Sequence, residues 1–235
     1  DAQRPSRIVL VRRSADGERQ FQGFAGDEGR GFADQALTSV ELPKPARWLL
    51  TGTLPLAAHA SADSLRGAVA QSKARGIALA VDVNWRPTFW DPVADPATGP
   101  GPKALAAIQP LLQEVALIKL AREEALWFFK TDDPGAIQEA LPQRPDVVVT
   151  DGAAPVRWCL ENQRGIQPAF NPAEVVDTTG AGDAFPAGLL PRWSASPAER
   201  VRFAAACGAL VCGGPGGIDP QPTEAQVEVF LGGVS

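Results

Sequence analysis

Methionine and tyrosine are both absent from this 235-residue sequence, although a chain of ordinary composition would hold several of each. A fragment of a longer protein, an engineered chain or a sequence with residues dropped would each give this result. The sequence alone does not choose among them. A motif that is missing from this chain is therefore weak ground for excluding a function.

Histidine and cysteine are also scarce. The single histidine, His59, has no partner at a spacing typical of catalysis, which favours a surface position. The three cysteines, Cys159, Cys207 and Cys212, are an odd number without metal-ligand spacing. We expect them to be free, buried thiols in a reducing compartment.

Long apolar runs and clusters of positive charge are lacking as well. No apolar stretch approaches the ~20 residues of a membrane span, and residues 1–7 are polar, unlike a signal peptide. Acidic residues outnumber basic ones by 27 to 22, and the lysines and arginines are spread along the chain. We therefore expect a cytoplasmic protein with no nucleic-acid partner and no membrane partner.

The sequence does contain a regular alternation of short apolar runs and longer amphipathic stretches. With 45% hydrophobic residues, the chain can bury one substantial core. Such alternation predicts an α/β fold, a mostly parallel sheet covered by helices, with ligands at the carboxyl ends of the strands. The alternating segments are residues 48–50, 64–75, 77–83, 102–114, 115–119, 122–129, 136–141, 147–150, 181–190 and 197–212.

The beginning of the chain has a different pattern. Residues 7–24 alternate apolar and polar positions on either side of Asp16-Gly17, a dipeptide suited to a tight turn. This pattern predicts a two-stranded hairpin. Because an isolated hairpin is marginally stable in water, we expect it to pair with strands from elsewhere.

One segment, residues 177–185, carries the clearest chemistry. It reads Asp-Thr-Thr-Gly-Ala-Gly-Asp-Ala-Phe and leads into an apolar helical stretch. Gly180 and Gly182 have no side chains to keep an anion from the backbone, so successive amides at a helix start can hold a phosphate without any lysine. Asp183, in the first helical turn, can accept the proton of an attacking hydroxyl group.

A purely structural interpretation of this segment is also possible. The glycines would then form a close-packed turn, and Asp183 would interact favourably with the helix dipole. The composition of all nine residues favours phosphate binding instead. The spacing matches neither a Walker A loop nor a dinucleotide-binding glycine turn.

Residues 177–185 resemble the C-terminal signature of the ribokinase-like family, the PfkB-type carbohydrate kinases. Asp82, Asn84 and Arg86, with Trp90, are similar to the Asp-x-Asn-x-Arg segment of the fructokinase branch. Residues 150–152 resemble a turn near the nucleotide, and residues 214–217 resemble a glycine-rich loop beside adenine. The resemblance implies a three-layer α/β/α catalytic domain over residues 25–235. Residues 1–24 would form part of a small β lid, through which two copies would pair as a homodimer.

The resemblance also implies a role for individual residues in an ATP-dependent sugar kinase that uses Mg²⁺ and K⁺. Asp183 would be the catalytic base, and Gly180, Ala181 and Gly182 would form an anion hole for the β- and γ-phosphates. Glu124 would help to organise magnesium. The remaining assignments are Thr150, Gly152, Gly214 and Gly217 to the nucleotide, Asn84 and Arg86 to the substrate or transferred phosphate, and Asp177 and Thr179 to potassium.

Three of these assignments have simpler alternatives. Asn84 and Arg86 would also fit a strand end that enters a turn. Glu124 would also fit an exposed helix face beside Glu123. Residues 214–217 would also fit a flexible connector.

The sequence departs from the family pattern at several places. Ala121 stands where the family's Asn-x-x-Glu element has asparagine, Pro155 stands in a turn where glycine is usual, and the family's Gly-Gly sugar signature, which precedes the hairpin, is not in the printed sequence. Pro186 and Pro191 fall in the helix expected after Asp183, where an interior proline costs ~3 kcal/mol. Pro186 is close enough to the helix start to be tolerated. Pro191 should end or kink the helix.

Three functions remain open on the sequence. The first is phosphorylation of a sugar primary hydroxyl, with fructose the first candidate because of residues 82–90. The second is a catalytically idle family member that binds nucleotide or a protein partner. The third is a nucleoside or vitamin kinase of the same fold.

Overall fold

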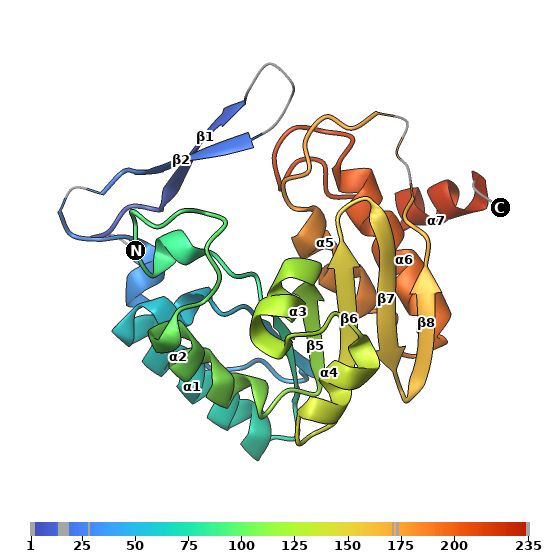
Figure 1. The fold of residues 1–235 in the computed structure, drawn as a ribbon, viewed down its shortest axis with the longest axis horizontal. Coiled ribbons are helices and arrows are strands. Elements are labelled where there is room, and N and C mark those ends of the chain that lie inside the picture. Colours follow the sequence, from blue (N-terminus) through green and yellow to red (C-terminus); the bar gives the residue numbers. More distant parts are fainter. Residues whose placement is uncertain (1–2, 14–18, 28, 171, 173, 234–235) are drawn as a thin grey trace. The chain divides into compact units, whose positions relative to one another are not determined.

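A computed structural model of the chain describes residues 3–13, 19–27, 29–170, 172 and 174–233. The chain forms two compact units, Asp1–Ala116 and Leu117–Ser235 (Figure 1). Each unit contains strands and helices in alternation, as the sequence predicts for an α/β protein. The predicted division at residue 24 separates a lid from a catalytic domain by function and stays a prediction.

The first unit begins with the predicted hairpin. Strands β1 (Ile8–Arg13) and β2 (Arg19–Ala25) pair antiparallel, from Ile8 opposite Ala25 to Arg13 opposite Arg19, with one irregularity between Leu10 and Val11. The hairpin prediction is confirmed. Its Asp16-Gly17 turn lies outside the described residues.

Arg7 fixes the base of this hairpin to the rest of the first unit. Its side chain is only 10% exposed, and Nη2 donates a hydrogen bond of 2.9 Å to Asp34 Oδ2. The guanidinium carbon lies 4.3, 4.2 and 4.3 Å from the ring centroids of Phe24, Phe32 and Phe89. Three aromatic faces and one carboxylate therefore surround a single cation, an arrangement that stabilises both charge and packing.

The body of the first unit is a strand–helix–strand unit. β3 (Trp48–Thr51) pairs parallel with β4 (Ala78–Asp82), and α1 (His59–Ala74) connects them. α1 packs on this strand pair through Ala68, which meets Leu42 and Ile77 in a small core. α2 (Pro102–Leu112) follows, and short 3₁₀ turns cover Ala33–Ala36, Leu54–Ala57 and Pro87–Phe89.

The second unit holds the four strands β5 (Leu117–Ala121), β6 (Asp146–Asp151), β7 (Ala154–Leu160) and β8 (Gln163–Gln167). β5 and β6 are parallel, whereas β6–β7 and β7–β8 are antiparallel. β5 and the centre of β6 are almost wholly buried and apolar, as expected for parallel strands covered on both faces. The sequence interpretation missed β7 and β8.

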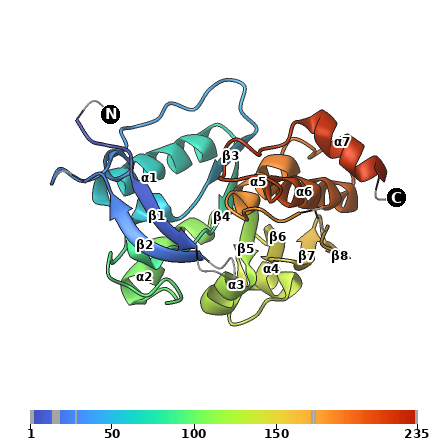
Figure 2. The same cartoon turned by 90° about the horizontal axis from the view of Figure 1, so that it is seen from above.

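Helices cover both faces of these four strands (Figure 2). α3 (Arg122–Phe129) and α4 (Pro134–Ala140) lie on one face, and α5 (Ala181–Leu189) and α6 (Pro197–Val211) lie on the other. α7 (Glu224–Gly233), which the sequence interpretation also missed, packs against α6. α5 approaches α6 closely because Gly188 has no side chain: a Cβ atom there would lie 2.6 Å from Cys207 Sγ.

Pro191 behaves as the sequence predicts, whereas Pro186 lies inside the helix and not in its first turn. α5 continues through Pro186, but Pro186 cannot donate the hydrogen bond that the Gly182 carbonyl would otherwise accept. α5 ends at Leu189, two residues before Pro191. Cys159, Cys207 and Cys212 are free thiols, and the first two are buried. Within the described part of the chain, no helix is both long and apolar enough to span a membrane.

Candidate functional site

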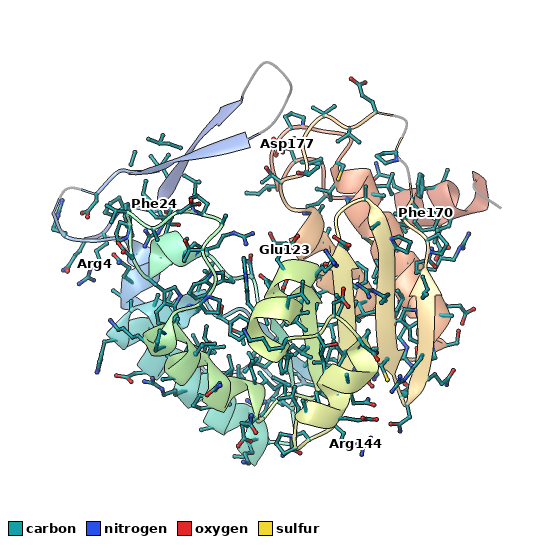
Figure 3. The ribbon with its side chains drawn as sticks, in the orientation of Figure 1. Arg4, Phe24, Glu123, Arg144, Phe170 and Asp177 are labelled. Atoms are coloured by element: carbon teal, nitrogen blue, oxygen red, sulfur yellow. The ribbon has the colours of Figure 1, made fainter. Side chains whose placement is uncertain are left out.

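The N-terminus of α5 is the centre of the candidate site. Asp177 lies in the loop that connects β8 to α5 (Figure 3). Gly180 precedes the helix with a left-handed backbone conformation, φ 82°, and Asp183 lies in the first turn with its side chain exposed. The first intrahelical bond runs from the Ala184 amide to the Gly180 carbonyl at 2.8 Å. The Ala181 amide donates to the Thr178 carbonyl at 3.4 Å, whereas the amides of Gly182 and Asp183 precede the first intrahelical bond. Amides at this position of a helix form the arrangement that binds anions.

Asp177 ties this loop to the glycine-rich loop at residues 213–217. Its Oδ1 accepts hydrogen bonds from the Thr179 amide at 2.8 Å and the Thr179 hydroxyl at 2.7 Å. Its Oδ2 accepts one from the Gly216 amide at 3.0 Å. Asp177 is thus a structural link between two segments that the sequence interpretation placed near one nucleotide.

The two loops also touch at glycines. A Cβ atom on Gly180 would lie 2.8 Å from Gly217 Cα and 3.0 Å from the Gly217 carbonyl oxygen. A Cβ atom on Gly217 would lie 3.3 Å from the Thr179 methyl carbon. Only glycine fits at Gly180, because both its backbone conformation and this contact exclude a side chain. The backbone of residues 179–180 therefore packs directly against Gly217.

The structure adds Lys119, a residue that the sequence interpretation did not include. It occupies the middle of β5 and is 7% exposed. A Cβ atom on Gly182 would lie 3.3 Å from Lys119 Nζ. The sequence interpretation expected a cradle without lysine because Lys119 is distant from Gly182 in the sequence, and only the fold brings the two together.

Glu124 lies at the N-terminus of α3, next to the carboxyl end of β5. It is 5% exposed, so the alternative of an exposed surface carboxylate is excluded. Its Oε2 accepts a hydrogen bond of 2.8 Å from the Ala121 amide. Because Ala121 has no side-chain acceptor, Glu124 supplies half of the capping arrangement that an asparagine at position 121 would complete.

Thr150 and Gly152 lie at the carboxyl end of β6, where the chain turns into β7. Thr150 pairs with Ala121 on β5, and its hydroxyl donates to the Leu120 carbonyl at 3.3 Å. Gly152 adopts φ 54° with no atom near its Cβ position. The carboxyl ends of β5 and β6 thus bring Thr150 and Glu124 to the same edge of the strand pair, where ligands of α/β folds bind.

An ion-pair network borders this edge. Asp132 Oδ2 accepts hydrogen bonds from Arg157 Nη2 at 2.6 Å and from Arg122 Nε at 2.9 Å. The Arg157 hydrogen bond, followed by that of Arg122, lowers the pKa of Asp132 to about 2 against the opposing effect of burial. Arg122 also lies 3.8 Å from Asp151. The network holds the start of α3 against the β6–β7 turn.

Asn84 and Arg86 belong to the first unit. Asn84 follows β4 with φ 43°, and the Gly52 Cβ position lies 4.0 Å from its Cβ atom. Arg86 donates from Nη1 to the Trp85 carbonyl at 2.8 Å. The Trp85 and Trp90 rings stack at 5.8 Å, which fixes the loop after β4 in a defined conformation.

Within the described part of the chain, no group of three or more His, Cys, Asp or Glu side chains is arranged to hold a metal ion. Glu124 and Asp177 are each engaged by backbone amides. Either carboxylate offers oxygen to a hard cation only together with phosphate, water or backbone oxygens.

Comparison with known proteins finds carbohydrate kinases, both as the matching family and as individual relatives. A family model described as "pfkB family carbohydrate kinase" matches residues 1–224. The chain is 28% identical over 237 residues to "Probable fructokinase-6, chloroplastic" of Arabidopsis thaliana, which covers 95% of this chain and 59% of that protein. It is 28% identical over 246 residues to a fructokinase of Vibrio alginolyticus, which covers 99% of this chain and 75% of that protein.

A solved structure supports the same fold. A double mutant of fructokinase from Vibrio cholerae O395, in "fructose, ADP and potassium ion bound form", matches 98% of this chain and 74% of its own, with a TM-score of 0.77 and 26% identity. The predicted fold class, a ribokinase-like α/β fold with a mostly parallel sheet flanked by helices, is confirmed.

Proposed function

The chain belongs to the pfkB family of carbohydrate kinases, a family of ATP-dependent sugar kinases, and on this premise we propose that it phosphorylates a primary hydroxyl group of a sugar. One observation carries the proposal. The α5 N-terminus places the amides of Gly182 and Asp183, which precede the first intrahelical bond, beside the exposed carboxylate of Asp183. An anion cradle and a base on one helical turn are what phosphoryl transfer requires.

In the proposed reaction, Asp183 accepts the proton of the sugar hydroxyl. The hydroxyl oxygen forms a bond to the γ-phosphorus, the bond from that phosphorus to the bridging oxygen breaks, and ADP leaves with the electron pair. The amides of Gly180, Ala181 and Gly182 hold the charge on the phosphoryl oxygens. A positioned base of this kind contributes about 10²–10⁴-fold to the rate.

The nucleotide would lie across the two linked loops. Gly214 and Gly217 on one loop, and Thr150 and Gly152 at the end of β6, would contact ATP. Magnesium supplies positive charge to the β- and γ-phosphates when bound, and Glu124 would help to hold it through water. Asp177 and the Thr179 backbone would border a K⁺ ion. The hydrogen bonds of Asp177 to both loops support this placement because they fix the backbone on either side.

Fructose is the proposed acceptor. The support is the loop after β4, with Asn84 and Arg86 held beside stacked tryptophans, together with the fructokinase names of the relatives. A coupled assay of ADP release tests it across fructose, glucose, ribose, adenosine and pyridoxal. We expect release with fructose well above release with the other acceptors.

A nucleoside substrate is the second candidate, favoured by one structural likeness. Aminoimidazole riboside kinase from Salmonella enterica, solved with aminoimidazole riboside and an ATP analogue, matches 98% of this chain with a TM-score of 0.74 at 22% identity. Release with adenosine above that with fructose would favour it. ATP binding without release for any acceptor would favour an idle binder, the alternative that the alanine at position 121 motivates.

Residues 1–24 are proposed to be part of a lid that pairs with the same hairpin of a second copy. The support is the exposure of three successive apolar residues on β1: Ile8 is 55%, Val9 52% and Leu10 43% exposed. Exposed apolar strands pair readily with further strands. Light scattering after size-exclusion chromatography should give twice the 24.7 kDa chain mass, and Val9→Glu should give the monomer mass.

A further inference from the structure

We infer that Arg7 is a positioning residue for the loop after β4, residues 84–90, and that it connects this loop to the hairpin of β1 and β2. The inference rests on the proposed function, because the contact of this loop with the sugar is part of that proposal. Arg7 is assigned no contact with the sugar. It acts through Phe89, which lies in the same turn as Arg86.

The contacts of Arg7 join two parts of the first unit that are distant in the sequence. Its guanidinium carbon lies 4.3 Å from the ring centroid of Phe24, on β2, and 4.3 Å from that of Phe89, on the loop. Figure 3 shows Phe24 at the base of the hairpin. The two rings also meet each other edge to face, with centroids 5.3 Å apart. One cation is therefore shared between the hairpin and the loop, and hydrogen bonds to Asp34 hold it there.

Phe89 is tied to Arg86 by the backbone. Both belong to one 3₁₀ turn, in which the Phe89 amide donates to the Arg86 carbonyl at 3.2 Å. The amides of Trp90 and Asp91 both donate to the Pro87 carbonyl at 2.9 Å. Hydrogen bonds between residues three and four apart join such a turn into one piece. Fixing the Phe89 ring therefore fixes the backbone from which the Arg86 side chain extends.

The loop also has two unfavourable features that its own hydrogen bonds do not offset. Asn84 adopts φ 43°, in the left-handed region. The Trp90 indole Nε1 is buried without a hydrogen-bond partner among the described residues, which is costly for a donor. Such features persist only where the surrounding structure holds the backbone in place. Stacking of Trp85 on Trp90 gives support from within the loop, and the contact of Arg7 with Phe89 gives it from outside.

Hydrogen exchange followed by mass spectrometry tests this connection without any need for turnover. Arg7→Lys keeps the charge and removes the flat guanidinium that stacks on the rings. We expect the amides of residues 89–91 to exchange about 5–10-fold faster in this variant, while the amides of α1 keep their wild-type rates. Arg66→Lys is the matched control, because Arg66 pairs with Asp63 at 2.8 Å on the exposed surface of α1. It should leave residues 89–91 unchanged.

Steady-state kinetics test the consequence for the sugar. In Arg7→Lys, kcat/KM for the best sugar acceptor should fall about 5–10-fold, while KM for MgATP stays within about twofold of wild type. Phe89→Leu removes the same contact from the loop side. Because coupling between two sites is reciprocal, this variant should speed the exchange of hairpin residues 23–25 by a similar factor.

Three results would overturn the inference. The first is wild-type exchange of residues 89–91 in Arg7→Lys. The second is faster exchange across the whole first unit, α1 included, which marks a general loss of stability. The third is an unchanged kcat/KM for the sugar in an active Arg7→Lys enzyme.

A second variant covers a failure to fold. If circular dichroism shows that Arg7→Lys is unfolded, Phe89→Leu decides through the exchange of residues 23–25, and failure of both variants to fold assigns a purely structural role and overturns the inference. The outcome is separate from the proposed reaction. Absence of turnover in the wild type with every sugar would refute the proposed function, whereas the exchange of residues 89–91 would still show whether Arg7 holds the loop.

Discussion

Replacing Gly180 by alanine should damage both the stability and the nucleotide affinity of this protein, for two separable reasons. Gly180 adopts φ 82°, a left-handed conformation that costs an L-residue about 1–2 kcal/mol. The new methyl group would also lie 2.8 Å from Gly217 Cα, and overpacking of this kind costs about 1–3 kcal/mol more. The expected total loss is therefore about 2–5 kcal/mol.

Gly76→Ala separates the two contributions. Gly76 follows α1 with φ 65°, and no atom lies within 4 Å of its Cβ position. This variant should lose only the conformational part, about 1–2 kcal/mol. Urea denaturation followed by circular dichroism gives the free energy of unfolding of both variants, and calorimetry gives their affinity for MgATP.

We expect the Gly180 variant to be less stable than the Gly76 variant and to bind MgATP more weakly, because the loop of residues 177–180 must move away from residue 217. The Gly76 variant should bind MgATP like the wild type. Equal stability losses in the two variants would refute the idea that the two loops are in rigid contact. Normal MgATP binding by Gly180→Ala would refute the assignment of the cradle.

Three further predictions concern other parts of the molecule. Arg7→Ala should lower the free energy of unfolding by about 2–3 kcal/mol in urea denaturation. Arg7→Lys should lower it less, because the charge stays and only the guanidinium's two-pronged hydrogen-bond geometry and part of its stacking are removed. Equal losses in the two variants would contradict this. The pKa of Asp132 is lowered to about 2, chiefly by the hydrogen bond from Arg157. The ionised carboxylate therefore stabilises the fold above about pH 4, and this contribution is lost as the pH falls toward 2. Asp132→Asn should make the melting temperature depend less on pH over that range, and an unchanged pH dependence would rule this out. Glu124→Gln keeps an oxygen that can cap α3, so thermal stability should change little. The Mg²⁺ concentration needed for half-maximal activity should rise, and an unchanged Mg²⁺ requirement would show that Glu124 does not help to hold the metal.

The sequence predicted most helices and strands because their periodicity is strong. The helix at residues 122–129 matches α3, and the hairpin at residues 7–24 differs from β1–β2 by one residue at each end. β8 was missed because its one large apolar residue, Ile166, is 67% exposed, so no buried apolar pattern marks the strand. β7 does alternate, since Val156, Trp158 and Leu160 are buried and Arg157 between them is only partly so. This is the pattern of an antiparallel strand with one solvated face, and the sequence interpretation overlooked it.

The site was predicted only as far as it is local in sequence. The helix start with Gly180 and Asp183 follows from consecutive residues. The contact of Gly180 with Gly217, the burial of Glu124 and the approach of Lys119 to Gly182 depend on how β5, α5 and the loop at residues 213–217 pack. A lysine within the apolar run 117–120 was the one sequence signal for the last of these, because such a position is uncommon for lysine.

The turnover of Asp183→Asn tests the central claim most directly. Asparagine keeps the size of the side chain but cannot accept the hydroxyl proton, so the account predicts a fall in kcat of at least about 100-fold, with MgATP affinity within about twofold of wild type. Glu174→Gln is the matched control, because Glu174 is an exposed carboxylate in the preceding loop, and its kcat should be unchanged. An Asp183→Asn protein that phosphorylates its sugar at the wild-type rate would contradict the account.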